Sequence, residues 1–256
     1  MNITKSSNPV FKERVFSKDY TTSSDVMTVN GTMNKTALML LLVVAGAVFT
    51  WNKFFEAAAS NPETAVSVVA PWLLIGGIGG FITVLVTVFR PKSSGISAPI
   101  YAVFEGLLLG GISAILETQT EQPIVLRAVL LTFAVFAAML FLYRSGIIKV
   151  TKKFMMGVFA ATAGIALVYL VSFIGGFFGM NTSFLYGSGN FSIGFSLVVV
   201  AIAALNLVLD FSFIERASDA GAPKYMEWYG AFGLMVTLIW LYLEILRLLA
   251  KIASRD

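Results

Sequence analysis

Seven long apolar segments follow one another along this chain, separated by short polar connections. Each is roughly 20 residues long, enough for an α-helix to cross about 30 Å of hydrocarbon. The segments are continuously apolar and do not alternate between apolar and polar residues, which excludes the strands of a membrane β-barrel. The pattern therefore predicts an all-α membrane protein with seven transmembrane helices. The expected spans are Thr36–Phe55, Ala70–Phe89, Ile100–Glu117, Ile124–Tyr143, Phe154–Phe178, Asn190–Ile214 and Tyr225–Ala250.

The connections between these spans are too short to hold a soluble domain, so we expect residues 36–256 to form one seven-helix transmembrane domain. Residues 1–35 are polar and rich in Ser, Thr, Asn and Lys. They contain no apolar core followed by a cleavage site, so they do not resemble a signal peptide. We interpret them as a flexible cytoplasmic N-terminal tail.

The composition agrees with a membrane protein and narrows the chemistry. Hydrophobic residues make up 57% of the chain and charged residues 12%, and there is no cysteine and no histidine. Disulfides, thiolate catalysis, imidazole metal sites and Ser-His machinery are therefore excluded. Aspartyl hydrolysis needs two facing carboxylates, and Asp210 is the only aspartate inside any expected span. We therefore expect no enzyme and no cofactor.

The basic residues indicate an orientation. The chain has 18 Lys+Arg against 14 Asp+Glu. When the connections are assigned to alternate sides, 13 of the 18 basic residues fall on the side of the N-terminus. The positive-inside rule then predicts a cytoplasmic N-terminus. We expect the membrane to be a bacterial inner (cytoplasmic) membrane, with lipid and not nucleic acid as the partner. The basic C-terminal end conflicts weakly with this, so a re-entrant last segment stays an alternative.

Small residues recur at helical spacing in three of the spans, where they favour close packing against a neighbouring helix. A gating hinge is the alternative in the glycine-rich second span. The small residues are Gly76, Gly77, Gly79 and Gly80 in the second span, Ala102, Gly106, Gly110 and Ala114 in the third, and Gly157, Ala161 and Gly164 in the fifth.

Two carboxylates lie inside expected spans at similar depth, Glu105 in the third and Asp210 in the sixth. An intramembrane charge costs roughly 2.5–3.5 kcal/mol on insertion scales, so its retention usually indicates a partner or an ion path. Alternatively, each carboxylate is close enough to a helix end to reach headgroup water. Asn206 lies one turn before Asp210 and adds a polar group to the same helix face.

The last span carries a polar seam. Gly233, Thr237, Trp240, Glu244 and Arg247 follow one another at spacings of 4, 3, 4 and 3, which places them on one helical face. Glu244 and Arg247 can pair within the helix. This pattern favours a helix surrounded by other helices, although the pair could also lie at the outer interface.

Three stretches of the chain resemble the Bax inhibitor/YccA (TMBIM) family of membrane proteins. They are Ala-Pro-Ile-Tyr-Ala-Val-Phe-Glu-Gly-Leu-Leu-Leu-Gly at 98–110, Ala-Leu-Asn-Leu-Val-Leu-Asp-Phe at 204–211 and Leu-Ile-Trp-Leu-Tyr-Leu-Glu-Ile-Leu-Arg-Leu-Leu at 238–249. The likeness extends over residues 30–256. It implies a bundle in which six helices surround the last one, and a pH-sensitive calcium leak gated by two aspartates on the last two helices.

The resemblance carries over only in part. Asp210 matches the aspartate of the sixth helix, but Thr237 stands where the second aspartate is expected, and a hydroxyl cannot share a proton as a second carboxylate does. Glu105 matches the acidic residue of the family's Glu-Gly signature and is the available substitute. The expected gate and ion path is therefore Asp210, Glu105, Asn206 and Thr237, with Asp210 and Glu105 as weak candidate metal ligands.

Two functions remain open from the sequence. The first is a passive pathway for cations, with calcium as the transported ion. Calcium prefers six to eight oxygen ligands, and these four residues offer too few for a tight site, which favours weak and partly hydrated passage. The second is a non-conducting membrane scaffold that modulates a partner such as a membrane-bound quality-control protease. Ion flux through the purified protein in liposomes distinguishes them.

Overall fold

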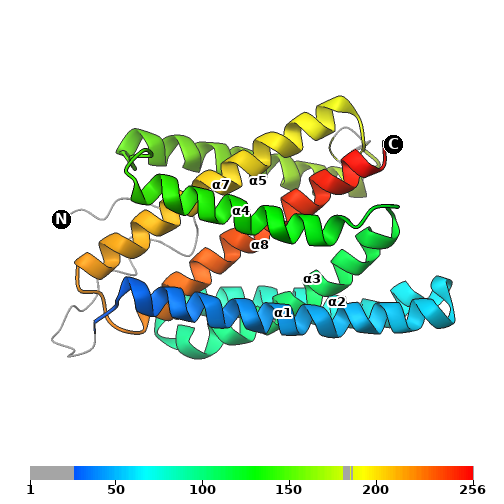
Figure 1. The fold of residues 1–256 in the computed structure, drawn as a ribbon, viewed down its shortest axis with the longest axis horizontal. Coiled ribbons are helices and arrows are strands. Elements are labelled where there is room, and N and C mark those ends of the chain that lie inside the picture. The colour runs from blue at the N-terminus through cyan, green and yellow to red at the C-terminus, as the bar shows by residue number, and fades with distance from the viewer. Residues whose placement is uncertain (1–25, 181–184, 186, 256) are drawn as a thin grey trace. The chain divides into compact units, whose positions relative to one another are not determined.

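The computed structural model describes residues 26–180, 185 and 187–255, and over these residues the chain is almost entirely helical (Figure 1). Short 3-10 turns at Pro62–Thr64 and Pro91–Ser93 lead into the second and third helices. Seven helices in this part of the chain are long and apolar enough to cross a membrane, which confirms the predicted fold class. They are α1 (Val29–Ser60), α2 (Ala65–Phe89), α3 (Ser94–Thr118), α4 (Ile124–Arg144), α5 (Lys152–Phe177), α7 (Asn190–Asp219) and α8 (Met226–Ala253).

Several helices extend beyond the apolar segments that predicted them. α1 begins at Val29, because the side chain of Thr28 caps it by accepting a hydrogen bond from the Gly31 N–H at 2.9 Å. The expected boundary between tail and membrane domain, at residue 35, therefore falls inside this helix. Hydropathy detects only the part of a helix at membrane depth, whereas capping decides where the helix begins. Residues 1–25 of the expected tail lie outside the described residues.

The chain groups into two compact units, a division that the hydropathy pattern does not indicate. Within the described residues, the first consists of 26–119 and 214–236 and is called here the α1–α3 unit. The second consists of 120–213 and 237–255 and is called the α4–α5 unit. α7 and α8 each contribute residues to both units.

In the α1–α3 unit, α3 packs closely against both α1 and α2, and the three helices lie side by side in Figure 1. A Cβ atom built on Gly106 or Gly110 would overlap the backbone of α1 at Val43 or Ala47. On α2, a Cβ atom on Gly76 would lie 2.7 Å from the carbonyl oxygen of Phe104. The close packing expected for the second and third spans is therefore confirmed.

The same expectation is wrong for α5. Cβ atoms built on Gly157 and Gly164 would meet nothing within 4 Å, and both glycines are exposed in the described part of the chain. The spacing of small residues defines a face of a helix, but it does not decide whether that face meets a neighbour or the outside of the protein.

α7 and α8 are the most buried helices. In each, 67% of the most apolar stretch is buried, against at most 44% in the other spans. α8 is thus mostly buried, and α7 is buried to the same extent. In the α4–α5 unit, Phe136 and Tyr143 of α4 pack their rings on Phe211 of α7, with centroids 5.4 and 6.0 Å away. These contacts cover the turn of α7 next to Asp210.

Candidate functional site

Asp210 and Thr237 are in direct contact inside the α4–α5 unit. The Thr237 hydroxyl donates a hydrogen bond of 2.5 Å to Oδ2 of Asp210. Asp210 is 0% exposed and Thr237 is 4% exposed, so the carboxylate has no direct access to solvent. A hydrogen bond to a carboxylate is about twice as strong as one between neutral groups. The Thr237 hydroxyl therefore binds the Asp210 carboxylate at the position where the family likeness predicts a second aspartate.

Asn206, one turn before Asp210 on α7, bonds to a different helix. Its side-chain amide donates to the hydroxyl of Thr162 on α5 and to the carbonyl oxygen of Ile202, both at 2.9 Å. Asn206 is buried at 4% exposure. The sequence predicts Asn206 as part of the site, but Thr162 lies 44 residues away and carries no signal of its own.

The predicted pair of Glu244 and Arg247 is present, and a third residue completes it. Nη1 of Arg247 lies 2.9 Å from Oε1 of Glu244. The Tyr169 hydroxyl on α5 donates to the Glu244 carboxylate at 3.0 Å and accepts from Arg247 at 3.1 Å. Glu244 is only 2% exposed, while the Arg247 side chain is 36% exposed. The carboxylate therefore faces the inside of the unit, and the arginine extends from it toward the surface.

A buried lysine lies one turn further along α8. Lys251 is 6% exposed, and its ammonium group donates to the Leu185 carbonyl oxygen at 2.6 Å and to the Ser196 hydroxyl at 2.8 Å. The Ser192 carbonyl oxygen lies 3.4 Å away. The sequence places Lys251 with the basic residues at the end of the last helix, where a lysine normally extends into water. The structure buries it instead.

These contacts form four successive polar levels between α5, α7 and α8, which we call the polar column. From Thr237 to Lys251 the column follows 14 helical residues of α8, or about 21 Å at a rise of about 1.5 Å per residue. That is roughly two-thirds of the hydrocarbon thickness of a membrane. The column consists of Asp210 with Thr237, Asn206 with Thr162, Glu244 with Tyr169 and Arg247, and Lys251 with Ser192 and Ser196.

Glu105, the other predicted carboxylate, belongs to the α1–α3 unit. It is half-buried on α3 and interacts with the hydroxyl of Tyr101 one turn earlier. A Cβ atom on Gly80 of α2 would lie 3.0 Å from its Oε1 atom, so the carboxylate lies against the glycine-rich surface of α2. Its role as a substitute partner for Asp210 stays a prediction.

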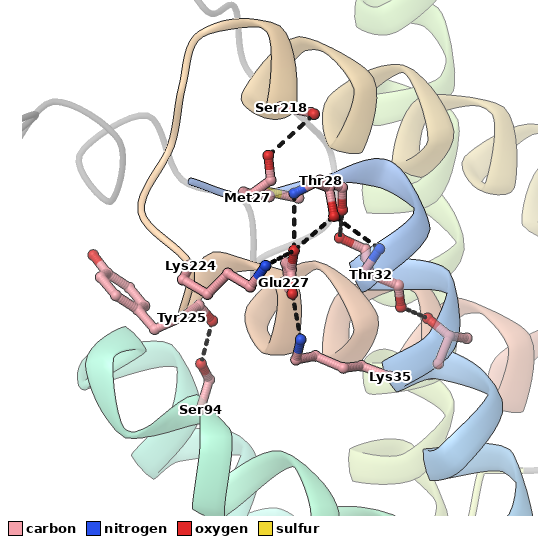
Figure 2. A network of polar contacts seen from close by, with 11 residues as sticks. Met27, Thr28, Thr32, Lys35, Ser94, Ser218, Lys224, Tyr225 and Glu227 are labelled. Atoms are coloured by element: carbon pink, nitrogen blue, oxygen red, sulfur yellow. Dashed lines mark hydrogen bonds and ion pairs between the residues drawn. The ribbon is translucent and has the colours of Figure 1, made fainter. Parts of the chain in front are cut away.

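The sequence pattern gives no indication of a further buried carboxylate, Glu227 at the start of α8. Its side chain is 0% exposed and lies between α1 and α8 in the α1–α3 unit (Figure 2). It accepts hydrogen bonds of 2.9 Å from both the backbone N–H and the hydroxyl of Thr28. It also forms ion pairs with Lys35 and with Lys224, the latter at 3.2 Å. In the sequence, Lys35 and Lys224 are two of the 13 basic residues on the predicted cytoplasmic side.

The backbone around Glu227 forms part of the same network. The segment before α1 docks on the turn between α7 and α8, where the Met27 N–H donates to the Ala222 carbonyl at 2.7 Å. The Ser94 hydroxyl at the start of α3 donates to the Tyr225 carbonyl at 3.0 Å, as Figure 2 shows. An acidic residue in the first turn of α8 is the one signal that could have drawn attention to Glu227.

The described residues contain no group of three or more acidic side chains placed to hold a metal ion. The polar column offers carboxylate, amide and hydroxyl oxygens in separate levels, interleaved with two cationic side chains. This arrangement suits transient contact with a hydrated ion better than tight coordination.

Comparison with known proteins gives one family. The profile of the family described as Bax inhibitor 1 like matches residues 8–254, which is nearly the whole chain. No curated protein and no solved structure matches significantly.

Proposed function

The chain belongs to the Bax inhibitor 1 like family and is an integral multi-pass membrane protein, and from this premise we propose that it is a cation leak gated around Asp210. Calcium is the proposed transported ion, and the leak responds to pH. The protein is proposed to act without catalysis or a resident cofactor, in the bacterial inner membrane with its N-terminus in the cytoplasm.

The observation that carries this proposal is the contact between Asp210 and Thr237. A carboxylate with 0% exposure is held by a hydroxyl on the neighbouring helix of a membrane protein. Placing an ionisable group inside a membrane span costs free energy. A group that is nevertheless present there usually belongs to an ion path, a proton relay or a gate. Because the two residues lie on separate helices, a change in the protonation of Asp210 alters the bond that joins α7 to α8.

The polar column supports passage in preference to storage. Its four levels present oxygen atoms over about 21 Å of α8, so a partly hydrated cation would exchange one set of ligands for the next. No level offers the six to eight oxygens of a tight calcium site. In the present arrangement Thr237 occupies one carboxylate oxygen of Asp210, which agrees with a closed state.

The test is calcium flux through the purified protein in liposomes over a series of pH values. Asp210→Asn keeps the shape of the side chain but cannot ionise, so we expect it to change both the size of the leak and its pH dependence. The matched control is Asp219→Asn, because Asp219 lies at the end of the same helix but is exposed. It should leave both quantities unchanged.

A second variant tests the mechanism from the other side of the contact. Thr237→Asp places two carboxylates together, and like charges at this distance favour the sharing of one proton. We expect the pH transition of the leak to move toward neutral pH. Glu105→Gln should alter the flux only if Glu105 has taken over the partner role.

If Asp210→Asn leaves the flux and its pH profile unchanged, Asp210 is not the gate. If the wild-type protein carries no ion flux at any pH, the non-conducting scaffold becomes the leading hypothesis. Its partner would then be sought among membrane-bound quality-control proteases.

A further inference from the structure

Lys251 differs from the other buried or paired lysines in the kind of atoms that surround it. Lys35 and Lys224 contact the carboxylate of Glu227, and Lys53 contacts that of Glu56. The acceptors of Lys251 are two backbone carbonyls and one hydroxyl, all of them neutral oxygens. Among the described residues it forms no ion pair.

Neutral carbonyl and hydroxyl oxygens around a positive charge are the ligands from which monovalent-cation sites are built. The three oxygens lie 2.6, 2.8 and 3.4 Å from Nζ of Lys251. Ser192 and Ser196 are themselves buried, at 1% and 0% exposure. The Leu185 carbonyl oxygen also accepts a hydrogen bond from the Ser192 hydroxyl at 2.6 Å. The three oxygens therefore belong to a buried polar cage, and the Lys251 ammonium group is the positive charge that they surround.

We propose that the oxygens of Leu185, Ser192 and Ser196 form a monovalent-cation site that the protein fills with its own ammonium group, and that Lys251 thereby plugs one end of the polar column. The first half of this proposal concerns binding and stands without any leak. The second half rests on the proposed function, because a plug has meaning only where ions pass.

The proposed cation site is tested by removing the Lys251 ammonium group and adding a soluble cation in its place. Lys251→Ala removes the ammonium group and most of its stem, and we expect the detergent-solubilised variant to unfold at a lower temperature than the wild type. Propylammonium, which replaces the lost atoms, or K⁺ should raise its melting temperature by about 2–4 °C at saturating concentration. n-Propanol fills the same space without a charge and should not.

A second substitution locates the effect. Ser196→Ala in the Lys251→Ala background removes the one side-chain oxygen of the site, so the response to propylammonium and K⁺ should weaken or disappear. If neither cation stabilises Lys251→Ala more than n-propanol does, there is no cation site, and Lys251 is only a structural bracket between α8 and α7.

The plug half is tested by monovalent-cation flux in liposomes. Lys251→Met keeps a packed apolar stem but removes the charge, and we expect the leak of K⁺ to rise on the order of tenfold, the effect of removing one repulsive charge near a path. The control is Lys53→Met, because Lys53 lies on the same predicted side of the membrane but is exposed. If the Lys251→Ala variant does not fold, the flux of Lys251→Met still tests whether Lys251 blocks ion passage.

The two proposals fail in different ways. A wild-type leak that responds to Asp210→Asn but not to Lys251→Met keeps the gate and overturns the plug. A protein with no leak in the wild type or in Lys251→Met overturns both the plug and the proposed function, while the melting experiment still decides the cation site.

Discussion

Glu227 shows how a single residue can be buried with its charge intact. The carboxylate is 0% exposed, and two lysines and both donors of Thr28 surround it. The donors come from the start of α1 and from the turn before α8. Their number explains why a charge is tolerated where burial alone would be unfavourable.

We therefore expect Glu227→Gln to lower the free energy of unfolding by about 1–3 kcal/mol, because the amide leaves two lysines without their carboxylate. Thermal unfolding in detergent measures this loss. Glu56→Gln is the matched control, since Glu56 also pairs with a lysine three residues away but is exposed at 66%. An exposed pair contributes about 0–1 kcal/mol. Equal effects of the two variants would show that burial of Glu227 contributes nothing.

For whole helices, close packing between two helices depends on whether their small residues lie against the backbone of a neighbouring helix. Gly106 and Gly110 lie directly on the α1 backbone, whereas Gly157 and Gly164 have open space beside them. The spacing along the two helices is nearly the same. α3 is thus held by close contact of helix backbones, and α5 is held by other residues, such as Tyr169 and Thr162.

Gly110→Ala should therefore separate α1 from α3 and destabilise the protein by about 1–3 kcal/mol, the usual cost of overpacking. Gly157→Ala should leave the stability unchanged or raise it by up to about 1 kcal/mol, because alanine favours the helix and meets nothing. The two melting temperatures provide the comparison. A Gly110→Ala protein as stable as the wild type would mean that α1 and α3 can move apart at no cost.

For the molecule as a whole, the orientation predicted from the basic residues is open to a direct experiment. Because the chain has no cysteine, single cysteines report position without background. Lys149→Cys, between α4 and α5, should react with an impermeant thiol reagent only from the cytoplasmic side. Glu121→Cys, between α3 and α4, should react from the outside. Both positions are exposed. The opposite labelling pattern would invert the topology.

A cysteine introduced at Ser254 tests whether the last helix crosses the membrane. α8 is one continuous helix of 28 residues, so we expect this cysteine to react with the reagent from the outside. Its length agrees with a full span. Protection of that cysteine from the outside reagent would instead favour the re-entrant segment.

The seven helices and the lengths of their apolar segments can be predicted from the amino-acid sequence alone. Each is a local property that depends only on consecutive residues and on the thickness of a membrane. Asp210 and Asn206 are predicted from the sequence, because a carboxylate or amide inside an apolar span is conspicuous without any structure. Thr237 joins them in the expected site through the family likeness. The pairing of Glu244 with Arg247 follows equally from their spacing of three residues.

The contacts that these residues make depend on the folded arrangement of distant helices. Tyr169 lies 75 residues from Glu244, and Lys35 lies 192 residues from Glu227, so no local pattern connects them. Lys251 and Glu227 look in the sequence like charges at helix ends, and the folded chain buries both. The physical reason is that a helix fixes the face on which each side chain lies, whereas packing against distant segments decides whether that face meets lipid, water or an oxygen atom of another helix.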